Sequence, residues 1–264
     1  FDNVQAAIYA VPANRVRENV RNTARIISGT PLFIIAAKGL ERDSGKRMSE
    51  IFFDELPGVH HRNICALSGP NLAREIIEGH PAMSVVGASD LAVAQSAQSI
   101  LNSSTFRVYT NEDLTGVELG GALKNIIAIG AGIADGMGYG ANTKAAYLTR
   151  GLAEITRLGV AAGASPSTFG GLAGLGDLMT TCYSPMSRNY RLGERLAKGQ
   201  EVENIVSEIG EIVEGINTVP AALEMAKTLQ VDMPITDAIN RILFESLDLT
   251  KAVDQLLSRD PKSE

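Results

Sequence analysis

The sequence predicts an α/β domain with a mainly parallel sheet, followed by an all-helical domain. Short apolar runs alternate with helix-like segments over the first 110 residues, which is the pattern of βαβ units. Beyond Thr110 we find no further convincing strand, only segments of helical periodicity. The chain has 264 residues and is 45% hydrophobic, enough to bury the core of one large or two smaller domains.

Five apolar runs in the first part have the length and composition of strands. They are residues 6–11, 32–36, 63–67, 83–87 and 106–109. Helical periodicity fills most of the gaps between them, and the strongest examples are residues 12–27, 45–55 and 91–101. A short segment, residues 71–78, lies between the third and fourth strands. In a sheet of this kind, ligands bind at the carboxyl ends of the strands.

The second part is divided into helices by Gly, Pro, Ser and Asn. The expected helices are residues 113–134, 143–162, 190–198, 202–207, 220–229, 235–244 and 250–257. The most apolar stretch, residues 119–134, contains Lys124 and is shorter than the ~20 residues that a membrane span needs. We therefore expect a buried core helix there and no membrane span. We divide the chain into residues 1–110, the sheet domain, and residues 111–264, the helical domain.

The sheet opens almost directly on its first strand. A dinucleotide-binding sheet begins instead with a strand, a glycine-rich turn and a helix whose N-terminus holds the pyrophosphate. The other glycine clusters do not substitute for that turn, because they lie inside a helical run or follow no strand. Either this is not a dinucleotide fold, or the sequence lacks the glycine fingerprint and roughly two strands with their helices.

Charge and composition exclude several classes of protein. A net charge of −6 disfavours a nucleic-acid-binding surface, although it allows one small cationic pocket. The two cysteines, Cys65 and Cys182, offer neither a disulfide framework nor metal-ligand spacing, and the three histidines pair with no carboxylate or cysteine at such spacing. Because the first residues are largely polar and the apolar run that follows is short, we expect no secretory leader. We expect a cytoplasmic protein that binds no metal and no nucleic acid.

Lys124 is the first candidate for chemistry. It is the only charged residue between Glu118 and Asp135, and Gly120, Gly121 and Ala122 precede it. Small residues let a ligand or another backbone approach closely. A lysine in such surroundings would lose hydration, which lowers its pKa and makes it usable as an acid or base. The alternative is a lysine whose head extends to water.

A second candidate site follows Gly174 and Gly176, which predict a tight turn. Asp177 comes next and could orient a lysine or accept a hydrogen bond from a substrate hydroxyl. Ser187, Arg188 and Asn189 precede a helix, so a hydroxyl, a guanidinium and an amide converge with helix N–H groups. This combination suits an anion. The alternative is ordinary capping of the helix by Ser or Asn.

Weaker candidates lie where strands end. Lys38 follows the second strand, and Gly69 and Asn71 follow the third, so all three face the expected ligand crevice. Glu214 could hydrogen-bond a cofactor amide or ribose. Taken alone, Lys38 is equally a surface lysine and Gly69-Pro70 a simple turn.

Together these segments resemble the bacterial NAD(P)-dependent glycerol-3-phosphate dehydrogenases. The resemblance covers essentially the whole chain in the right order and is most specific from Gly120 to Asn189. The motifs that carry it are Ala36-Ala37-Lys38-Gly39-Leu40-Glu41, Leu67-Ser68-Gly69-Pro70, Gly120-Gly121-Ala122-Leu123-Lys124-Asn125, Asp135-Gly136, Asn142-Thr143-Lys144-Ala145, Gly174-Leu175-Gly176-Asp177-Leu178, Thr181-Cys182, Ser187-Arg188-Asn189 and Val213-Glu214-Gly215.

The resemblance implies a Rossmann domain followed by a helical domain, and a reaction that interconverts dihydroxyacetone phosphate and sn-glycerol 3-phosphate with NADPH or NADH for glycerophospholipid synthesis. It implies that Lys124 is catalytic and passes a proton to or from the substrate oxygen. Position 71 departs from the family, which more often has a small hydroxyl residue there. We expect a homodimer. The implied substrate contacts are Lys38, Gly69, Asn71, Lys124, Asp177, Ser187, Arg188 and Asn189. The implied cofactor contacts are Pro12, Lys38, Ala73, Arg188, Ile212 and Glu214.

Two other functions stay open from the sequence. The first is a related hydroxyacid or ketopantoate-type dehydrogenase, which also has a catalytic lysine on the helix after the domain boundary. The anion site at Ser187, Arg188 and Asn189 favours a phosphorylated triose over a hydroxy acid. The second is a fragment of the enzyme that binds its cofactor poorly and is inactive.

Overall fold

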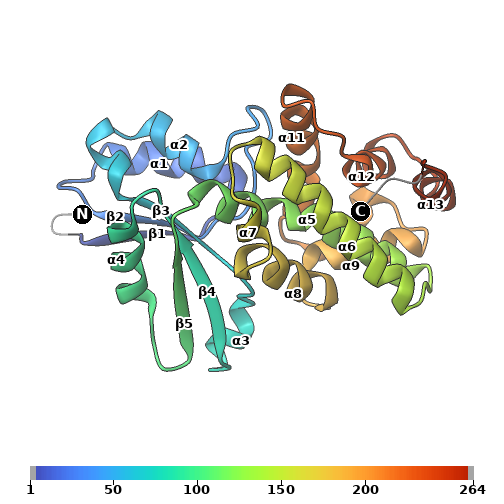
Figure 1. Ribbon diagram of the computed structural model, residues 1–264, viewed down its shortest axis with the longest axis horizontal. Coiled ribbons are helices and arrows are strands. Elements are labelled where there is room, and N and C mark those ends of the chain that lie inside the picture. The colour runs from blue at the N-terminus through green and yellow to red at the C-terminus, as the bar shows by residue number, and fades with distance from the viewer. Residues whose placement is uncertain (1–3, 261–264) are drawn as a thin grey trace.

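The computed structural model describes residues 4–260 and contains a five-stranded sheet followed by a helical region (Figure 1). The strand order is β1-β2-β3-β4-β5, and every neighbouring pair is parallel except β3 and β4. The predicted fold class is thus confirmed. The strands are β1 (Ala6–Tyr9), β2 (Leu32–Ile35), β3 (Ile64–Ser68), β4 (Ala82–Gly87) and β5 (Phe106–Asn111).

Helices cover both faces of the sheet, as buried strands require. The helices α1 (Val16–Ala24) and α2 (Met48–Glu55) lie on one face, where they bury Phe33 and Ile35. On the other face α4 (Leu91–Leu101) packs against Ile34 and Val86. The remaining short elements of this half are the 3-10 turns η1 (Ala13–Arg15) and η2 (Gly58–Asn63) and the helix α3 (Ala73–Ile77).

The antiparallel pairing of β3 and β4 departs from a purely parallel sheet. A parallel connection needs a crossover that returns the chain to the opposite edge of the sheet. Here Ser68 pairs with Val85, and the connection between the strands contains only the five-residue α3. The chain therefore turns back, and the carboxyl end of β4 lies at the edge opposite to the ends of β1, β2 and β3.

The helical region is built around α5 (Leu114–Gly136). Its length and apolar composition would allow it to cross a membrane, but 94% of its most apolar window is buried by other parts of the protein. It is therefore the core helix that the sequence predicts. The helices around it are α6 (Ala141–Ala161), α7 (Pro166–Phe169), α8 (Asp177–Tyr183), α9 (Arg188–Ala197), α10 (Val202–Ile209), α11 (Glu214–Thr228), α12 (Pro234–Phe244) and α13 (Leu249–Leu257).

The prediction of a tight turn at Gly174 and Gly176 is wrong. Residues Leu172–Gly176 form a π-helical turn that continues directly into α8. Any side chain on Gly174 would collide with the Phe169 backbone, so glycine is there for close packing rather than for a reversal of the chain. The predicted start of a helix at Pro220 is also wrong, because α11 begins at Glu214 and contains this proline.

The sheet and the helical region are joined by a largely buried ion pair between Arg47 and Glu118. Glu118 of α5 accepts hydrogen bonds from the Ser49 backbone N–H at 2.7 Å and from the Arg47 guanidinium at 2.7 Å. Ser49 lies in the first turn of α2, where the backbone N–H groups have no partner within the helix and a carboxylate can accept hydrogen bonds from them. Burial raises the pKa of Glu118 against the opposing effect of Arg47. This contact fixes α2 against α5.

Candidate active site

Lys124 lies inside the protein and does not extend to water. Its side chain is 8% exposed, and its ammonium group donates to Asp177 Oδ1 and to the Thr181 hydroxyl, the latter at 2.6 Å. The small residues before it permit this burial. A Cβ on Gly120 would lie 2.7 Å from the Ala173 carbonyl oxygen, and one on Gly121 would lie 2.5 Å from Ser68 Oγ. Sheet and π-turn therefore approach α5 directly beside Lys124.

Asp177 connects two lysines. While Oδ1 faces Lys124, Oδ2 accepts from Lys38 Nζ at 2.7 Å and from Ser68 Oγ at 3.3 Å. Burial alone would raise the pKa of Asp177, but the two ammonium groups outweigh it and hold the pKa below its usual value. The carboxylate is thus ionised and has one charge for two cations.

Lys38 follows β2 and points across the carboxyl edge of the sheet. Its ammonium group also donates to the Gly69 carbonyl at 2.9 Å and to Asn71 Oδ1 at 2.6 Å. Loss of hydration lowers the pKa of Lys38 to about 8, against the opposing attraction of Asp177. Gly69 has φ = +125°, a conformation that favours glycine, and this brings its carbonyl to the lysine.

Asn71 is held between two elements. Its amide oxygen accepts from Lys38, and its Nδ2 donates to the buried Ser84 hydroxyl of β4 at 3.1 Å. The longer Asn side chain therefore reaches both partners at once. The resemblance implies a small hydroxyl residue at position 71. The Asn71 amide found there instead restrains the ammonium group of Lys38.

The three residues of the expected anion site have different surroundings. Ser187 is the N-cap of α9 and accepts from the Tyr190 N–H at 3.2 Å. Arg188 is 40% exposed and pairs with Glu211 at 3.3 Å. Asn189 is buried: it donates to Asn125 Oδ1 at 2.9 Å and accepts from the Gly215 N–H at 2.9 Å. Since Asn125 follows Lys124 on α5, this bond brings the start of α9 beside the lysine.

Glu214 links the helical region to the segment after β1. Its Oε1 accepts from the Ala13 N–H at 3.1 Å, whereas Oε2 is buried without a hydrogen-bond partner. Burial raises the pKa of this carboxyl group. An unpaired buried carboxylate oxygen is costly, so a ligand N–H or O–H is the expected partner.

The other residues expected to contact the cofactor are exposed or half-buried. Pro12 is exposed and precedes Ala13, Ala73 is the exposed first residue of α3, and Ile212 is half-buried two residues before Glu214.

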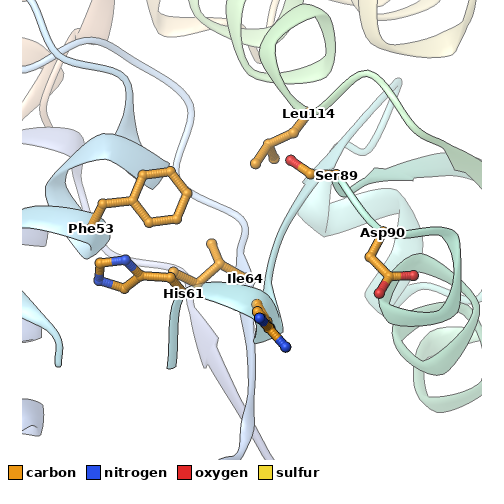
Figure 2. A pocket seen from close by; sticks show the side chains of 7 residues that line it. Phe53, His61, Ile64, Ser89, Asp90 and Leu114 are labelled. Carbon is orange, nitrogen blue, oxygen red and sulfur yellow. The ribbon is translucent and has the colours of Figure 1, made fainter. Parts of the chain in front are cut away.

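One surface cavity lies away from these residues. It has a volume of about 510 Å³ and is lined by Phe53, His61, Arg62, Ile64, Ser89, Asp90 and Leu114 (Figure 2). Ile64 is the first residue of β3 and Ser89 follows the antiparallel β4, so this cavity is at the opposite edge of the sheet from Lys38. We place the candidate site at the cluster of Lys38, Asp177 and Lys124, because groups with shifted pKa values gather there.

Two contributors to the cluster had no role assigned from the sequence, Thr181 and Ser68. Thr181 follows Asp177 by one helical turn, and its hydroxyl also donates to the Asp177 carbonyl at 2.7 Å. The spacing of four residues could have indicated it, had α8 been expected as a helix. Ser68 is the last residue of β3 and gave no such indication.

The sheet topology, the buried lysine and carboxylate beside the carboxyl ends of its strands, and the helical domain behind them fit a dehydrogenase of the Rossmann-plus-helical class. Residues 1–94 match the N-terminal and residues 113–254 the C-terminal family profile of NAD-dependent glycerol-3-phosphate dehydrogenase. The chain therefore belongs to the NAD-dependent glycerol-3-phosphate dehydrogenase family.

Individual proteins that resemble this chain support the same family assignment. The chain is 44% identical to glycerol-3-phosphate dehydrogenase [NAD(P)+] of Listeria monocytogenes, over 100% of this chain and 78% of that protein. It is 47% identical to the enzyme of the same name from Geobacillus thermodenitrificans, over 100% of this chain and 77% of that one. The crystal structure of the Coxiella burnetii glycerol-3-phosphate dehydrogenase superposes with a TM-score of 0.92 at 34% identity, covering 98% of this chain and 78% of that one.

The activity of the family is accordingly that of this protein, an NAD(P)-dependent oxidoreductase of glycerol 3-phosphate. A ketopantoate reductase from Ralstonia eutropha shares the fold, with a TM-score of 0.55 at 11% identity. That likeness is one of fold alone and does not support the alternative hydroxyacid function.

Proposed function

We propose that Lys124 is the catalytic acid–base of this dehydrogenase. The observation that carries the proposal is the bridge that Asp177 forms between Lys124 and Lys38. A buried lysine that one ionised carboxylate and one hydroxyl hold in place is oriented for transfer of a single proton. The bridge also leaves a surplus positive charge, which suits a phosphorylated, anionic substrate.

The substrate contacts that we propose surround this bridge. Lys38, Gly69, Asn71 and Asp177 would hold the triose at the carboxyl edge of the sheet, while Ser187, Arg188 and Asn189 would receive its phosphate at the start of α9. The dipole of that helix and its free N–H groups favour a doubly charged anion. The bond from Asn189 to Asn125 supports this arrangement, because it connects the start of α9 to the helix that carries Lys124.

The residues at Glu214 fit a nicotinamide cofactor, NADH or NADPH. The unpaired Oε2 would accept from an N–H or O–H of the cofactor, and Pro12, Lys38, Ala73, Arg188 and Ile212 would line the rest of its path. When bound, the cofactor supplies the hydride in the reducing direction and accepts it in the other.

The chain's own residues handle the proton. In the reducing direction the Lys124 ammonium donates to the ketone oxygen of dihydroxyacetone phosphate. Asp177 and Thr181 fix its orientation, and Lys38 stabilises negative charge that develops on the substrate oxygen. In the oxidising direction neutral Lys124 accepts the hydroxyl proton of sn-glycerol 3-phosphate. Asp177 then stabilises the ammonium that forms.

We also propose the wider setting of the enzyme. The domain boundary lies near residue 110, which is supported by the change from strands to helices there. Cys65 and Cys182 are both free and buried, which supports the reducing cytoplasm as its location. There the enzyme would act as a homodimer and supply glycerol 3-phosphate for glycerophospholipid synthesis.

The substitution Lys124→Ala in the full-length protein tests the proposal. Loss of a positioned acid–base reduces turnover by about 10²- to 10⁴-fold, while binding of NADPH, followed by its fluorescence, stays near that of the unaltered protein. Retained turnover would remove Lys124 from the mechanism. Assays of the unaltered protein with dihydroxyacetone phosphate and with a 2-keto acid separate the two substrate classes.

A further inference from the structure

The ammonium group of Lys144 is enclosed outside the cluster of Lys38, Asp177 and Lys124. The residue is 7% exposed and lies in the first turn of α6. Its Nζ donates to Asp135 Oδ2 at 2.6 Å, and the Tyr190 hydroxyl donates to the same oxygen at 2.7 Å. The ring centres of Tyr183 and Tyr190 lie 4.0 Å and 5.4 Å from Nζ. One carboxylate and two aromatic faces thus surround the cation, a combination that binds ammonium groups well.

These partners come from three helices, which meet around Lys144 of α6. Asp135 is in the last turn of α5, Tyr183 is the last residue of α8, and Tyr190 is in the first turn of α9. Burial and the neighbouring Asp135 carboxylate raise the pKa of Tyr190, so its hydroxyl stays a donor. Lys144 therefore contacts both ends of the segment 183–190.

This segment carries the proposed phosphate contacts. Ser187 caps α9 within it, and Arg188 and Asn189 follow directly. At its other end Tyr183 comes two residues after Thr181, which holds Lys124. A shift of the segment would move the phosphate contacts away from the substrate phosphate, which would weaken substrate binding and raise the KM.

Backbone packing fixes α9 from Tyr190 onward, but it does not fix Tyr183. Side chains on Gly132 and Gly193 would collide with the Tyr190 and Ile129 carbonyl groups, so α5 and α9 are in close backbone contact without help from Lys144. Tyr183, in contrast, is 54% exposed, and its ring covers the Lys144 ammonium. Loss of the cation would release the segment between α8 and α9 rather than the fold.

We propose that Lys144 is a positioning residue that holds the segment 183–190, and with it the phosphate contacts, in place. The inference rests on the proposed function, in that Ser187, Arg188 and Asn189 must receive the substrate phosphate. Lys144 itself touches neither the substrate nor Lys124. Its effect is therefore on the binding of the phosphate and on substrate affinity more than on proton transfer.

The test is steady-state kinetics of Lys144→Met in the full-length protein. We expect the KM for dihydroxyacetone phosphate to rise about tenfold or more, with kcat changed by less than about threefold. Lys144→Arg keeps the charge and should recover part of the KM. The matched control is Lys198→Met, which removes an exposed lysine paired with Glu194 and should change neither constant. A purely structural role would lower kcat with the folded fraction at unchanged KM, and that result would overturn the inference.

Two further variants keep the inference testable. Tyr183→Leu removes the exposed ring from the cation without disturbing a buried position, and should raise the KM in the same direction if Lys144→Met does not fold. Arg188→Leu tests the phosphate contact itself. An unchanged KM in Arg188→Leu would refute the phosphate assignment and the inference with it. A raised KM in Arg188→Leu, with an unchanged KM in both Lys144→Met and Tyr183→Leu, would refute the inference alone.

Discussion

The Lys38 ammonium donates to Asp177 Oδ2 at 2.7 Å, although the two residues are 139 positions apart in the sequence. One belongs to the sheet and the other to the helical region, so the contact forms only when the two parts are docked. Because the other oxygen of Asp177 faces Lys124, the carboxylate serves two cations. This arrangement makes Asp177 the residue on which the charge of the site depends.

Asp177→Asn should therefore damage both stability and turnover. Removal of the charge leaves two buried or half-buried ammonium groups without a countercharge, and loss of one partner of a buried ion pair costs about 3–5 kcal/mol of unfolding free energy. Denaturant unfolding measures this loss. Addition of Lys38→Met to Asp177→Asn should recover part of the stability but none of the turnover. A single Asp177→Asn variant with unaltered stability would show that the bridge is not needed to compensate the lysines.

The pH dependence of substrate reduction should reflect Lys38. Its pKa is lowered to about 8, so the ammonium form that faces the substrate is lost as the pH rises through that value. We expect kcat/KM for dihydroxyacetone phosphate to fall above about pH 8. Lys38→Arg should move this fall to higher pH, because a guanidinium keeps its charge. If the profile of Lys38→Arg coincides with that of the unaltered protein, another group controls the fall.

The lowered pKa of Lys38 also makes the free energy of unfolding depend on pH. Between the folded value of about 8 and the ordinary value of 10.5, the unfolded chain binds the Lys38 proton and the folded protein does not. The contribution of this group to unfolding free energy therefore rises with pH across that window. Unfolding of Lys38→Met, compared with the unaltered protein at several pH values in the window, isolates that contribution.

Glu214→Ala should weaken cofactor binding specifically. The proposed hydrogen bond to Oε2 involves a charged acceptor, and such bonds contribute about 1.5–3 kcal/mol, which corresponds to about 10- to 100-fold in Kd. Fluorescence titration with NADPH measures the change. Glu208→Ala is the control, since Glu208 is an exposed glutamate paired with Arg195. Equal NADPH affinity in the two variants would remove Glu214 from the cofactor site.

The sequence predicts the strands well because each is a short apolar run that the sheet buries. Predictions from the sequence fail where a residue that is typical of a turn or a helix start is instead required by tertiary packing. Gly174 predicts a turn from local chemistry, but it is a glycine so that the Phe169 backbone can approach a continuous helix. Pro220 predicts a helix start, but buried contacts of Gly215 and Thr218 against the core extend α11 on its N-terminal side.

Within the candidate site, spacing along the chain identified the residue types but not their pairing. Lys38, Lys124 and Asp177 each follow a local pattern, yet the pattern does not say that one carboxylate joins both lysines. Such a pairing depends on how α8 docks onto α5 and onto the residues that follow β2, which is a long-range property. Asn189 illustrates the same limit, because its side chain is used in bonds to Asn125 and Gly215 that no local motif indicates.

Glu154→Ala should lower stability while leaving the site intact. The Glu154 side chain is buried in α6 and accepts from the Ile235 N–H at 2.9 Å, the Thr236 N–H at 2.8 Å and the Thr236 hydroxyl at 2.8 Å. It thus completes the N-terminus of α12, where Pro234 lacks an N–H and the next two N–H groups have no partner within the helix. Its removal leaves these donors buried and unpaired, which we expect to cost about 2–3 kcal/mol.

Chemical denaturation of Glu154→Ala measures that cost, and Glu245→Ala at the exposed C-terminal end of α12 is the matched control. Glu154→Gln retains an oxygen for Thr236 but loses the charge that the helix dipole favours. Its free energy of unfolding should therefore lie between those of Glu154→Ala and Glu245→Ala. Because Glu154 makes no contact with the Lys38–Asp177–Lys124 cluster, the folded variant should keep its KM for both substrates. A rise in KM at unchanged stability would instead connect α12 to the active site, contrary to the capping role.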